Sequence, residues 1–308
     1  MATLVQQLAS ALPEERRERL LTIFDIGCEG GVPKAWRQSS PYATVVGFEP
    51  DPRAFEQLAI SPAIQQYPVA LADSARSLTL NITRGVDKSS ILRPNMDLLT
   101  RFPNSGRYEV VDELHLPPSA VSTVDAIASD HGIGSVDFLK VDVQGAEDLV
   151  LRGARAALRE SVLGLQIEVE FLEIYKDQPL FGDIDRIIRS AGFELMDLDR
   201  VYWKRAEHSH FEGRGQLAYA DALYLRNLDQ AMTQIQRDSD PVRRVIGLAI
   251  VACTYGLHDY AAAALGSYCS LGLQNSAIAR DALQTILDHD CVTGSWADYD
   301  RRLGNVAN

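Results

Sequence analysis

The sequence predicts an α/β fold: one doubly wound, mostly parallel sheet with helices on both faces, followed by an all-helical appendage. Between about residues 20 and 199, apolar runs of strand length alternate with helical patterns, which is typical of a parallel sheet. Two of these runs end in an acid followed by a glycine turn. Beyond Asn227 the sequence becomes alanine-rich and helical, which predicts the appendage.

We expect two domains, an α/β domain over residues 1–226 and a helical region over residues 227–308. A chain of 308 residues is long enough for one large α/β domain and an accessory piece. Residues 1–20 should form an amphipathic helix that covers the edge of the sheet. Three helices through about His289 would make a small bundle, for which we expect packing or the formation of a homo-oligomer.

The first two strands are apolar runs over 21–25 and 44–48, and residues 67–73 are a third short strand with its exit loop. Pro50-Asp51-Pro52 suits a turn into a helix that reaches Leu58. Leu78 to Ile82 alternates as a half-buried strand does, and residues 108–114 are its expected partner. The stretch 85–107 between them is rich in Ser, Asn, Pro, Gly and charge, which predicts a long loop of the kind that often acts as a lid.

The second half continues the alternation of strands and helices. Helices are expected over 121–130, 147–158 and 184–191, and strands over 136–142, 162–171, 193–199 and 216–225. The last strand should be antiparallel to its neighbour. Ligands of such sheets lie outside the carboxyl ends of the strands, where several acids of this chain fall.

Composition limits the classes of function. The net charge of −12, without a cluster of Lys and Arg, argues against a nucleic-acid partner and favours a neutral or cationic substrate. Four scattered cysteines without C-x-x-C pairs indicate neither a metal site nor disulfides, so a reducing cytoplasm is expected. The most apolar stretch, 245–257, is shorter than the roughly 20 residues that span a bilayer, so no membrane span is expected.

The first glycine turn predicts a pocket for a small ligand. The strand ends in Asp25, and Gly27, Gly30 and Gly31 follow, where the backbone can approach a ligand closely. The next strand ends in Glu49, which is placed to bind both hydroxyls of a ribose. The spacing D-x-G-x-x-G-G differs from the G-x-G-x-x-G of dinucleotide enzymes and favours a ligand without a pyrophosphate, such as S-adenosylmethionine. A nicotinamide-dependent dehydrogenase and a plain strand-to-helix turn are the alternatives.

Several blocks together resemble the FkbM-type S-adenosylmethionine-dependent methyltransferases. The likeness runs from about Phe24 to Leu225, and its blocks are 25–31, 48–52, 122–125, 138–147 and 151–154. The resemblance implies a seven-stranded, Rossmann-like methyltransferase sheet and O-methyl transfer to a hydroxyl of a sugar, glycan or natural product. A methyltransferase-like module that binds without turnover is the non-enzymatic alternative.

The expected cofactor contacts come from the acids and glycines of these blocks. Asp25, Gly27 and Gly31 would shape the methionine pocket, Glu49 would hold the ribose, and Asp73 would lie near the adenine. Glu29 stands where the family usually has Asn, so it could pair with the ammonium group of the donor or repel its carboxylate.

Asp142 and Glu168 are the first candidates for catalytic residues. Asp142 could contact donor or acceptor, or could simply cap the following helix. Gln166, Glu168 and Glu170 share one face of a strand, where buried carboxylates are costly unless paired. A base role for Glu168 and a Lys140–Glu168 ion pair are both open.

Histidine and aromatic residues near the last strands supply further candidates. His208, with His210 in the same loop, is a candidate general base, a weak candidate metal ligand, or part of a solvated loop. No metal site is predicted. Tyr202 and Trp203 could stack on a sugar ring or belong to the core, and Tyr175 could line the acceptor pocket.

Overall fold

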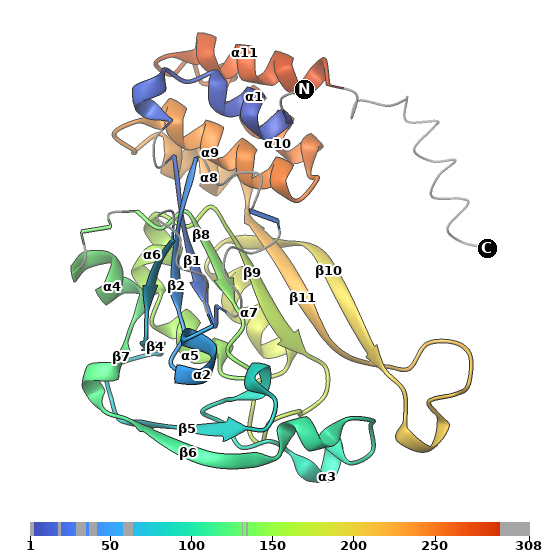
Figure 1. Ribbon diagram of the computed structural model, residues 1–308. Helices are drawn as coiled ribbons and strands as arrows, with labels where there is room; N and C mark the ends of the chain where they lie inside the picture. Colours follow the sequence, from blue (N-terminus) through green and yellow to red (C-terminus); the bar gives the residue numbers. More distant parts are fainter. Residues whose placement is uncertain are drawn as a thin grey trace. The chain divides into compact units, whose positions relative to one another are not determined.

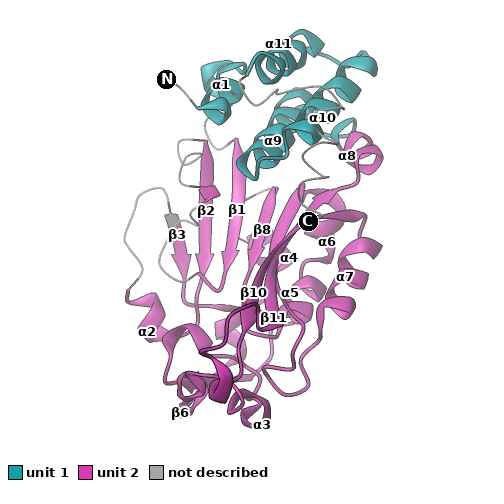
Figure 2. Cartoon of the chain, turned by 90° about the vertical axis from the view of Figure 1, so that its right-hand side faces the viewer, with its two compact units in different colours: residues 1–18, 235–308 teal, residues 19–234 magenta. Residues whose placement is uncertain are grey.

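The computed structural model describes residues 3–17, 20–28, 35–36, 42–57, 64–130, 132–133 and 135–289. The chain divides into two compact units (Figure 2). One comprises residues 19–234, and the other joins residues 1–18 to residues 235–308.

A seven-stranded sheet forms the centre of the unit 19–234, in the order β10-β11-β9-β8-β1-β2-β3 (Figure 1). Its strands are β1 (Leu21–Ile26), β2 (Ala43–Phe48), β3 (Ile64–Tyr67), β8 (Phe138–Val141), β9 (Gly164–Glu170), β10 (Phe193–Trp203) and β11 (Gln216–Arg226). The first five pair in parallel, and β11 runs antiparallel to both of its neighbours. The predicted fold class and the predicted antiparallel last strand are therefore confirmed.

The central strands are continuous apolar runs because both of their faces are covered. All six residues of β1 are buried, including its one acid, as expected for a strand of a parallel sheet between helix layers. The edge strand β10 is mostly half-buried or exposed. It was predicted to end at Asp199, but it continues to Trp203 because β11 pairs with it along that length.

Five helices of this unit are α2 (Pro52–Phe55), α4 (Val124–Asp130), α5 (Glu147–Arg152), α6 (Arg155–Glu160) and α7 (Phe181–Ser190). The helix predicted over 147–158 is broken into α5 and α6 at Gly153. A Cβ atom there would lie 2.0 Å from the carbonyl oxygen of Ala72, so only glycine permits this approach. The break therefore has a long-range cause that the helical pattern does not contain.

Two small sheets lie outside the main sheet. The antiparallel pair β5 (Leu78–Thr83) and β6 (Val110–Leu116) confirms the predicted partners and lies beyond the carboxyl ends of the parallel strands (Figure 1). β4 (Ala70–Leu71) pairs with β7 (Val121–Ser122). The stretch 67–73, predicted as one short strand and its exit loop, is thus divided at Pro68, which has no N–H to donate to a ladder.

The stretch 85–107 is not a structureless loop. It contains α3 (Met96–Leu99) and two 3₁₀ turns, Val86–Lys88 and Ser105–Tyr108. Isolated bridges join Asn81 to Ser90 and Pro94 to Tyr175, so β5 and the segment after β9 hold this stretch.

The helical unit contains α1 (Leu4–Ser10), α9 (Pro241–Thr254), α10 (His258–Ser270) and α11 (Ser276–Leu287), and α8 (Leu228–Ile235) precedes it. The N-terminal helix was expected on the sheet edge of the first domain. It instead packs against α9 and α11. The reason is that α9 is buried on nearly all sides, so it needs apolar cover from several helices. Among the described residues, no helix combines the length and the apolar character that crossing a bilayer requires.

Candidate functional site

A cavity of about 790 Å³, partly open to solvent, lies at the carboxyl ends of β1, β2 and β8. We call it the strand-end cavity. Apolar side chains from β2, β4 and β5 form much of its wall, and polar groups come from the strand ends. Its lining residues are Ile26, Gly27, Phe48, Glu49, Pro50, Ala54, Val69, Ala70, Leu71, Leu78, Leu80, Val86, Asp87, Ser89, Ile91, Asp142, Val143, Gln144 and Ala146.

Gly27 joins three strand ends at this cavity. Its φ of +77° belongs to the left-handed region, and a Cβ atom would lie 1.8 Å from the carbonyl oxygen of Asp142. The Gly27 amide donates to the Phe48 carbonyl over 2.9 Å, and the Asp142 amide donates to the Ile26 carbonyl over 2.9 Å. Glycine at this position therefore lets the exits of β1, β2 and β8 meet.

Glu49 lines the cavity at the end of β2, as the ribose role requires. Its Oε1 accepts a hydrogen bond from the Asp51 amide over 2.7 Å. A carboxylate has about four acceptor positions on its two oxygens, and the Asp51 amide occupies one of those of Glu49.

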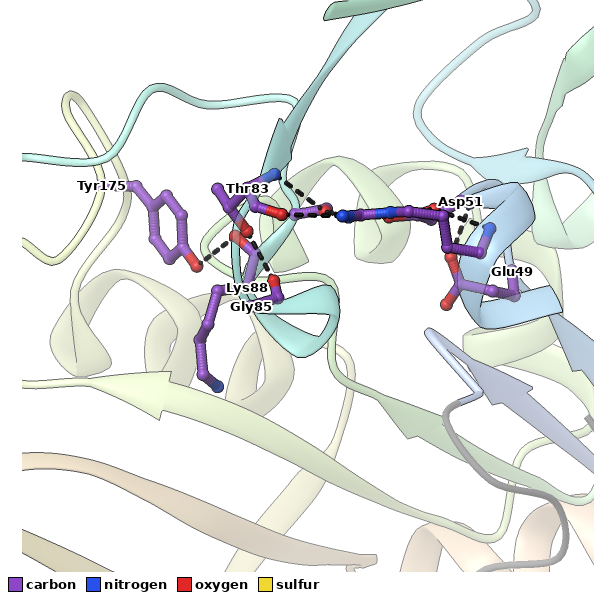
Figure 3. A network of polar contacts seen from close by, with 8 residues as sticks. Glu49, Asp51, Thr83, Gly85, Lys88 and Tyr175 are labelled. Atoms are coloured by element: carbon purple, nitrogen blue, oxygen red, sulfur yellow. Dashed lines mark hydrogen bonds and ion pairs between the residues drawn. The ribbon is translucent and has the colours of Figure 1, made fainter. Parts of the chain in front are cut away.

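A polar network ties the end of β2 to the segment after β5 (Figure 3). The Arg53 guanidinium contacts Asp51 Oδ2 at 2.7 Å and donates to the Ser89 hydroxyl at 3.1 Å and the Thr83 carbonyl at 2.9 Å. The Ser89 hydroxyl in turn donates to Asp51 Oδ2 over 3.0 Å. Burial alone would raise the pKa of Asp51, but the hydrogen bonds from Arg53 and Ser89 outweigh burial and lower it. The network thereby holds residues 86–91 at the cavity.

Asp25 is only 2% exposed, and it faces a lysine. The strand register places Asp25 beside Lys140, whose Nζ lies 3.2 Å from Asp25 Oδ1 and donates to the Gly27 carbonyl over 3.3 Å. Burial raises the pKa of Asp25, and the Lys140 ammonium opposes that rise. Lys140 thus pairs with Asp25, whereas the sequence suggested Glu168 as its partner.

Asp142 and Glu168, the two predicted catalytic acids, are bridged by Gln144. The Gln144 Nε2 donates to Asp142 Oδ1 over 2.7 Å and to Glu168 Oε1 over 3.0 Å. Gln144 has a φ of +57°, and the Ser90 hydroxyl donates to its carbonyl over 2.7 Å. The Tyr175 hydroxyl lies 2.9 Å from Gln144 Oε1. Sequence reasoning missed Gln144, although it stands in the same block of residues, between Asp142 and Gly145.

Lys88 brings a positive charge to these acids from the segment predicted as a loop. Its Nζ lies 3.4 Å from Gln144 Oε1 and 3.3 Å from Asp87 Oδ2, and its side chain is 14% exposed. Burial raises the pKa of Glu168 well above the usual value, the charge of Asp142 adds to the rise, and Lys88 opposes it. No motif in the sequence marked Lys88.

Glu147, interpreted from the sequence as an early helical residue, is fully buried and turns back toward the strand end. Its Oε1 accepts from the amides of Val143 at 3.0 Å and Gly145 at 3.2 Å, so it holds the turn that carries Gln144. Burial raises the pKa of Glu147 to about 7, despite these hydrogen bonds. Glu170 on β9 is buried as well, and burial raises its pKa well above the usual value.

The raised pKa of Glu147 predicts a pH-dependent stability. The unfolded chain releases the proton of Glu147 near pH 4.5, and the folded chain releases it near pH 7. The stability that protonated Glu147 contributes is therefore fully present below pH 4.5 and is lost as the pH rises through 7. The effect of Glu147→Gln on the free energy of unfolding should therefore be more favourable at pH 8 than at pH 5, by up to about 3 kcal/mol. Urea unfolding of both proteins at the two pH values measures this, with exposed Glu160→Gln as the control. An equal effect of Glu147→Gln at both pH values would contradict it.

The remaining predicted site residues lie apart from this cluster or outside the described residues. His208 is exposed in the hairpin between β10 and β11, beside Phe211, and does not line the strand-end cavity. Asp73 pairs with Arg76 at 3.2 Å, one residue beyond the buried Ala72. Glu29 and Gly31 fall outside the described residues. Among the residues that the structure describes, no group of three or more His, Cys, Asp or Glu could hold a metal ion.

A second cavity of about 810 Å³ adjoins the first, since Asp87 lines both. We call it the aromatic cavity. Side chains from the 85–108 segment and from β10 and β11 surround it. They are Asp87, Lys88, Leu99, Phe102, Pro103, Asn104, Ser105, Arg107, Tyr108, Tyr202, Trp203, Lys204 and Tyr219. Tyr202 and Trp203 thus line a cavity, and Trp203 also packs against a hydrophobic cluster that includes Phe102 and Tyr108.

The chain was compared with curated proteins and with solved structures. 2-O-methyltransferase NoeI of Sinorhizobium fredii is 28% identical over 188 residues, which is 56% of this chain and 72% of that protein. A TehB-like methyltransferase of Corynebacterium glutamicum has a TM-score of 0.30 at 13% identity, covering 72% of this chain and 88% of its own. The magnesium protoporphyrin IX methyltransferase of Synechocystis, solved with bound S-adenosylmethionine, has a TM-score of 0.32 at 11% identity, covering 73% and 78%.

The family match extends over most of the sheet and both of its glycine turns. The model of the methyltransferase FkbM domain matches residues 27–195, from the turn after β1 into β10. Because this match spans more than half of the chain, the protein belongs to the FkbM family of S-adenosylmethionine-dependent methyltransferases.

Proposed function

We propose that this methyltransferase transfers the methyl group to a hydroxyl of a sugar, glycan or related natural product. The observation that carries the proposal is the pair of acids, Asp142 and Glu168, joined through Gln144 at the edge of the strand-end cavity. The name of 2-O-methyltransferase NoeI agrees with oxygen as the acceptor atom. The family assignment weighs against the alternative of a nicotinamide-dependent dehydrogenase.

The strand-end cavity fits the donor. Gly27 lines the cavity where three strand ends meet, and the apolar wall, which includes Phe48, Leu71 and Leu80, suits a flat adenine ring. Glu49 at the rim would accept hydrogen bonds from the ribose. The bound donor supplies a methyl group made electrophilic by its sulfonium.

The acids would assist the acceptor. A sugar hydroxyl is a weak acid, so its proton must pass to a base as the oxygen attacks. Burial makes Glu168 a stronger proton acceptor than an ordinary carboxylate, while Asp142, which lines the cavity, would orient the hydroxyl. Gln144 and Lys88 would hold these acids in position. His208 stays a second candidate base, and the homo-oligomer, the cytoplasmic location and the absence of a nucleic-acid partner stay predictions from the sequence.

Donor binding gives the first test. Wild-type protein should bind S-adenosylhomocysteine in calorimetry, and Glu49→Ala should weaken binding about 10- to 100-fold, since hydrogen bonds to a charged group contribute roughly 1.5–3 kcal/mol. Glu56→Ala, an exposed acid just beyond α2, is the matched control and should bind as the wild type does. Unchanged affinity in Glu49→Ala would remove Glu49 from the donor site.

Transfer from radiolabelled donor to a panel of glycosides and polyhydroxylated natural products tests the reaction. We expect the acceptor to carry the label after treatment that hydrolyses esters, because the proposed product is a methyl ether. Donor binding without transfer to any acceptor would favour the binding module instead.

A further inference from the structure

The aromatic cavity has a wall of interlocking rings. The centroid of the Trp203 ring lies 5.3 Å from that of Phe102, 6.0 Å from that of Tyr219 and 6.3 Å from that of Tyr108. All three ring pairs are arranged edge to face. The ring of Tyr108 in turn lies against that of Tyr175, with 6.0 Å between the centroids. The hydroxyl of Tyr175 donates a hydrogen bond to Gln144 Oε1. Such a wall presents flat apolar faces against which the C–H face of a sugar ring can pack. The ring series also leads from this cavity to the paired acids.

The two cavities meet at Asp87 and Lys88. Asp87 lines both of them, and Lys88 of the aromatic cavity donates to Gln144 of the strand-end cavity. A molecule in the aromatic cavity would therefore lie beside the acids at which the proposed transfer takes place. This position makes the aromatic cavity the site of the acceptor, an assignment that rests on the proposed function.

The charge around the aromatic cavity is opposite in sign to that of the whole chain. The chain has 42 acidic and 30 basic residues, but the charged residues of this lining are Lys88, Arg107, Lys204 and one acid, Asp87. Lys88 and Arg107 share the same oxygen of Asp87, and the charges of Glu168 and Asp142 also act on Lys88. The excess of positive charge in this lining is therefore carried by Arg107 and Lys204. The Lys204 ammonium donates to the carbonyl of Phe211, which is a neutral partner, and no acid of the described residues forms an ion pair with it.

We propose that the acceptor is an anionic sugar, with its ring on the aromatic wall and its carboxylate or phosphate group at Lys204 and Arg107. The excess of positive charge in a partly enclosed cavity attracts such a group more strongly than an exposed surface would. The net charge of the chain, which favoured a neutral or cationic substrate, does not describe this cavity.

Three nitrophenyl glycosides that differ at a single ring substituent test the proposal. A glucoside is neutral, the glucuronide carries a carboxylate, and the glucoside phosphate carries a phosphate at the same carbon. In calorimetry with S-adenosylhomocysteine present, at least one anionic ligand should bind about tenfold more tightly than the glucoside, and added salt should reduce the difference. The stronger of the two anions identifies the charged group.

Lys204→Gln should abolish most of this preference and leave the binding of the neutral glucoside unchanged. Lys176→Gln, an exposed lysine that does not line the cavity, is the matched control. Three results would overturn the proposal: equal affinity for the neutral and anionic ligands, an equal loss for all three in Lys204→Gln, or no binding of any of them in the millimolar range. Binding of S-adenosylhomocysteine is recorded in the same samples, so failure of the donor site is seen separately from failure of the anion preference.

Discussion

Replacing Glu168 by glutamine is expected to lower the turnover number about 100- to 10,000-fold, the range that loss of a general base produces. Glutamine keeps the size of the side chain and can still meet Gln144, which now lies 3.0 Å from Glu168 Oε1. It cannot take the proton of an acceptor hydroxyl. Single-turnover transfer with saturating donor measures the chemical step, and S-adenosylhomocysteine calorimetry should show unchanged donor affinity.

The pH profile separates loss of a base from loss of structure. Burial raises the pKa of Glu168, and only the deprotonated form can act as a base, so wild-type transfer should rise with pH through that pKa. In Glu168→Gln this rise should disappear. Glu160→Gln, an exposed acid on α6, is the control and should keep the wild-type profile.

His208 supplies the opposing outcome. If His208 is the base, the rise of transfer with pH disappears in His208→Gln and remains in Glu168→Gln. Turnover within about twofold of the wild type in Glu168→Gln would remove Glu168 from the proposed chemistry. Asp142→Asn is the corresponding change from acid to amide at the residue that lines the cavity. It is expected to raise the KM for the acceptor, because we assign Asp142 to orienting the acceptor hydroxyl.

Gly27→Ala should have the largest effect on folding and donor binding together. The new Cβ atom would overlap the carbonyl oxygen of Asp142, 1.8 Å away, and φ at this position is +77°. Left-handed backbone strain and overpacking each cost roughly 1–3 kcal/mol, so the free energy of unfolding should fall by about 3 kcal/mol or more. Relief of the overlap requires the exits of β1 and β8 to separate, so affinity for S-adenosylhomocysteine should fall at least about tenfold.

Gly182→Ala is the matched control, since a Cβ atom there meets nothing within 4 Å and the residue lies in the helix α7. It should leave donor affinity unchanged and stabilise the protein slightly, because alanine favours a helix by up to about 1 kcal/mol. Urea unfolding and calorimetry measure both variants. Wild-type stability in Gly27→Ala would mean that the approach of Gly27 to Asp142 is not rigid.

The sequence was most informative where local pattern determines structure. Apolar runs that end in an acid located β1, β2 and β8, and a glycine turn follows the first and the last of them. The carboxyl ends of these parallel strands fall at one edge of the sheet. Alternation identified the β5–β6 pair. The positions of Asp25, Gly27, Glu49, Asp142 and Glu168 at or near strand ends followed from the same reasoning, whereas the family was indicated by the resemblance of several sequence blocks.

Only the tertiary structure decided which of these residues meet. The partner of Lys140 is Asp25 because the register of β8 against β1 places them side by side, and no spacing along the chain encodes that register. Lys88 joins the acids because Arg53 and Ser89 anchor a segment that looks like a loop. The N-terminal helix packs on α9 and α11, more than two hundred residues away in sequence. The sequence alone thus determined the elements, the family and the edge of the sheet that carries the site. The contacts within the site were decided by packing between distant segments, because strand register and side-chain burial depend on the whole fold.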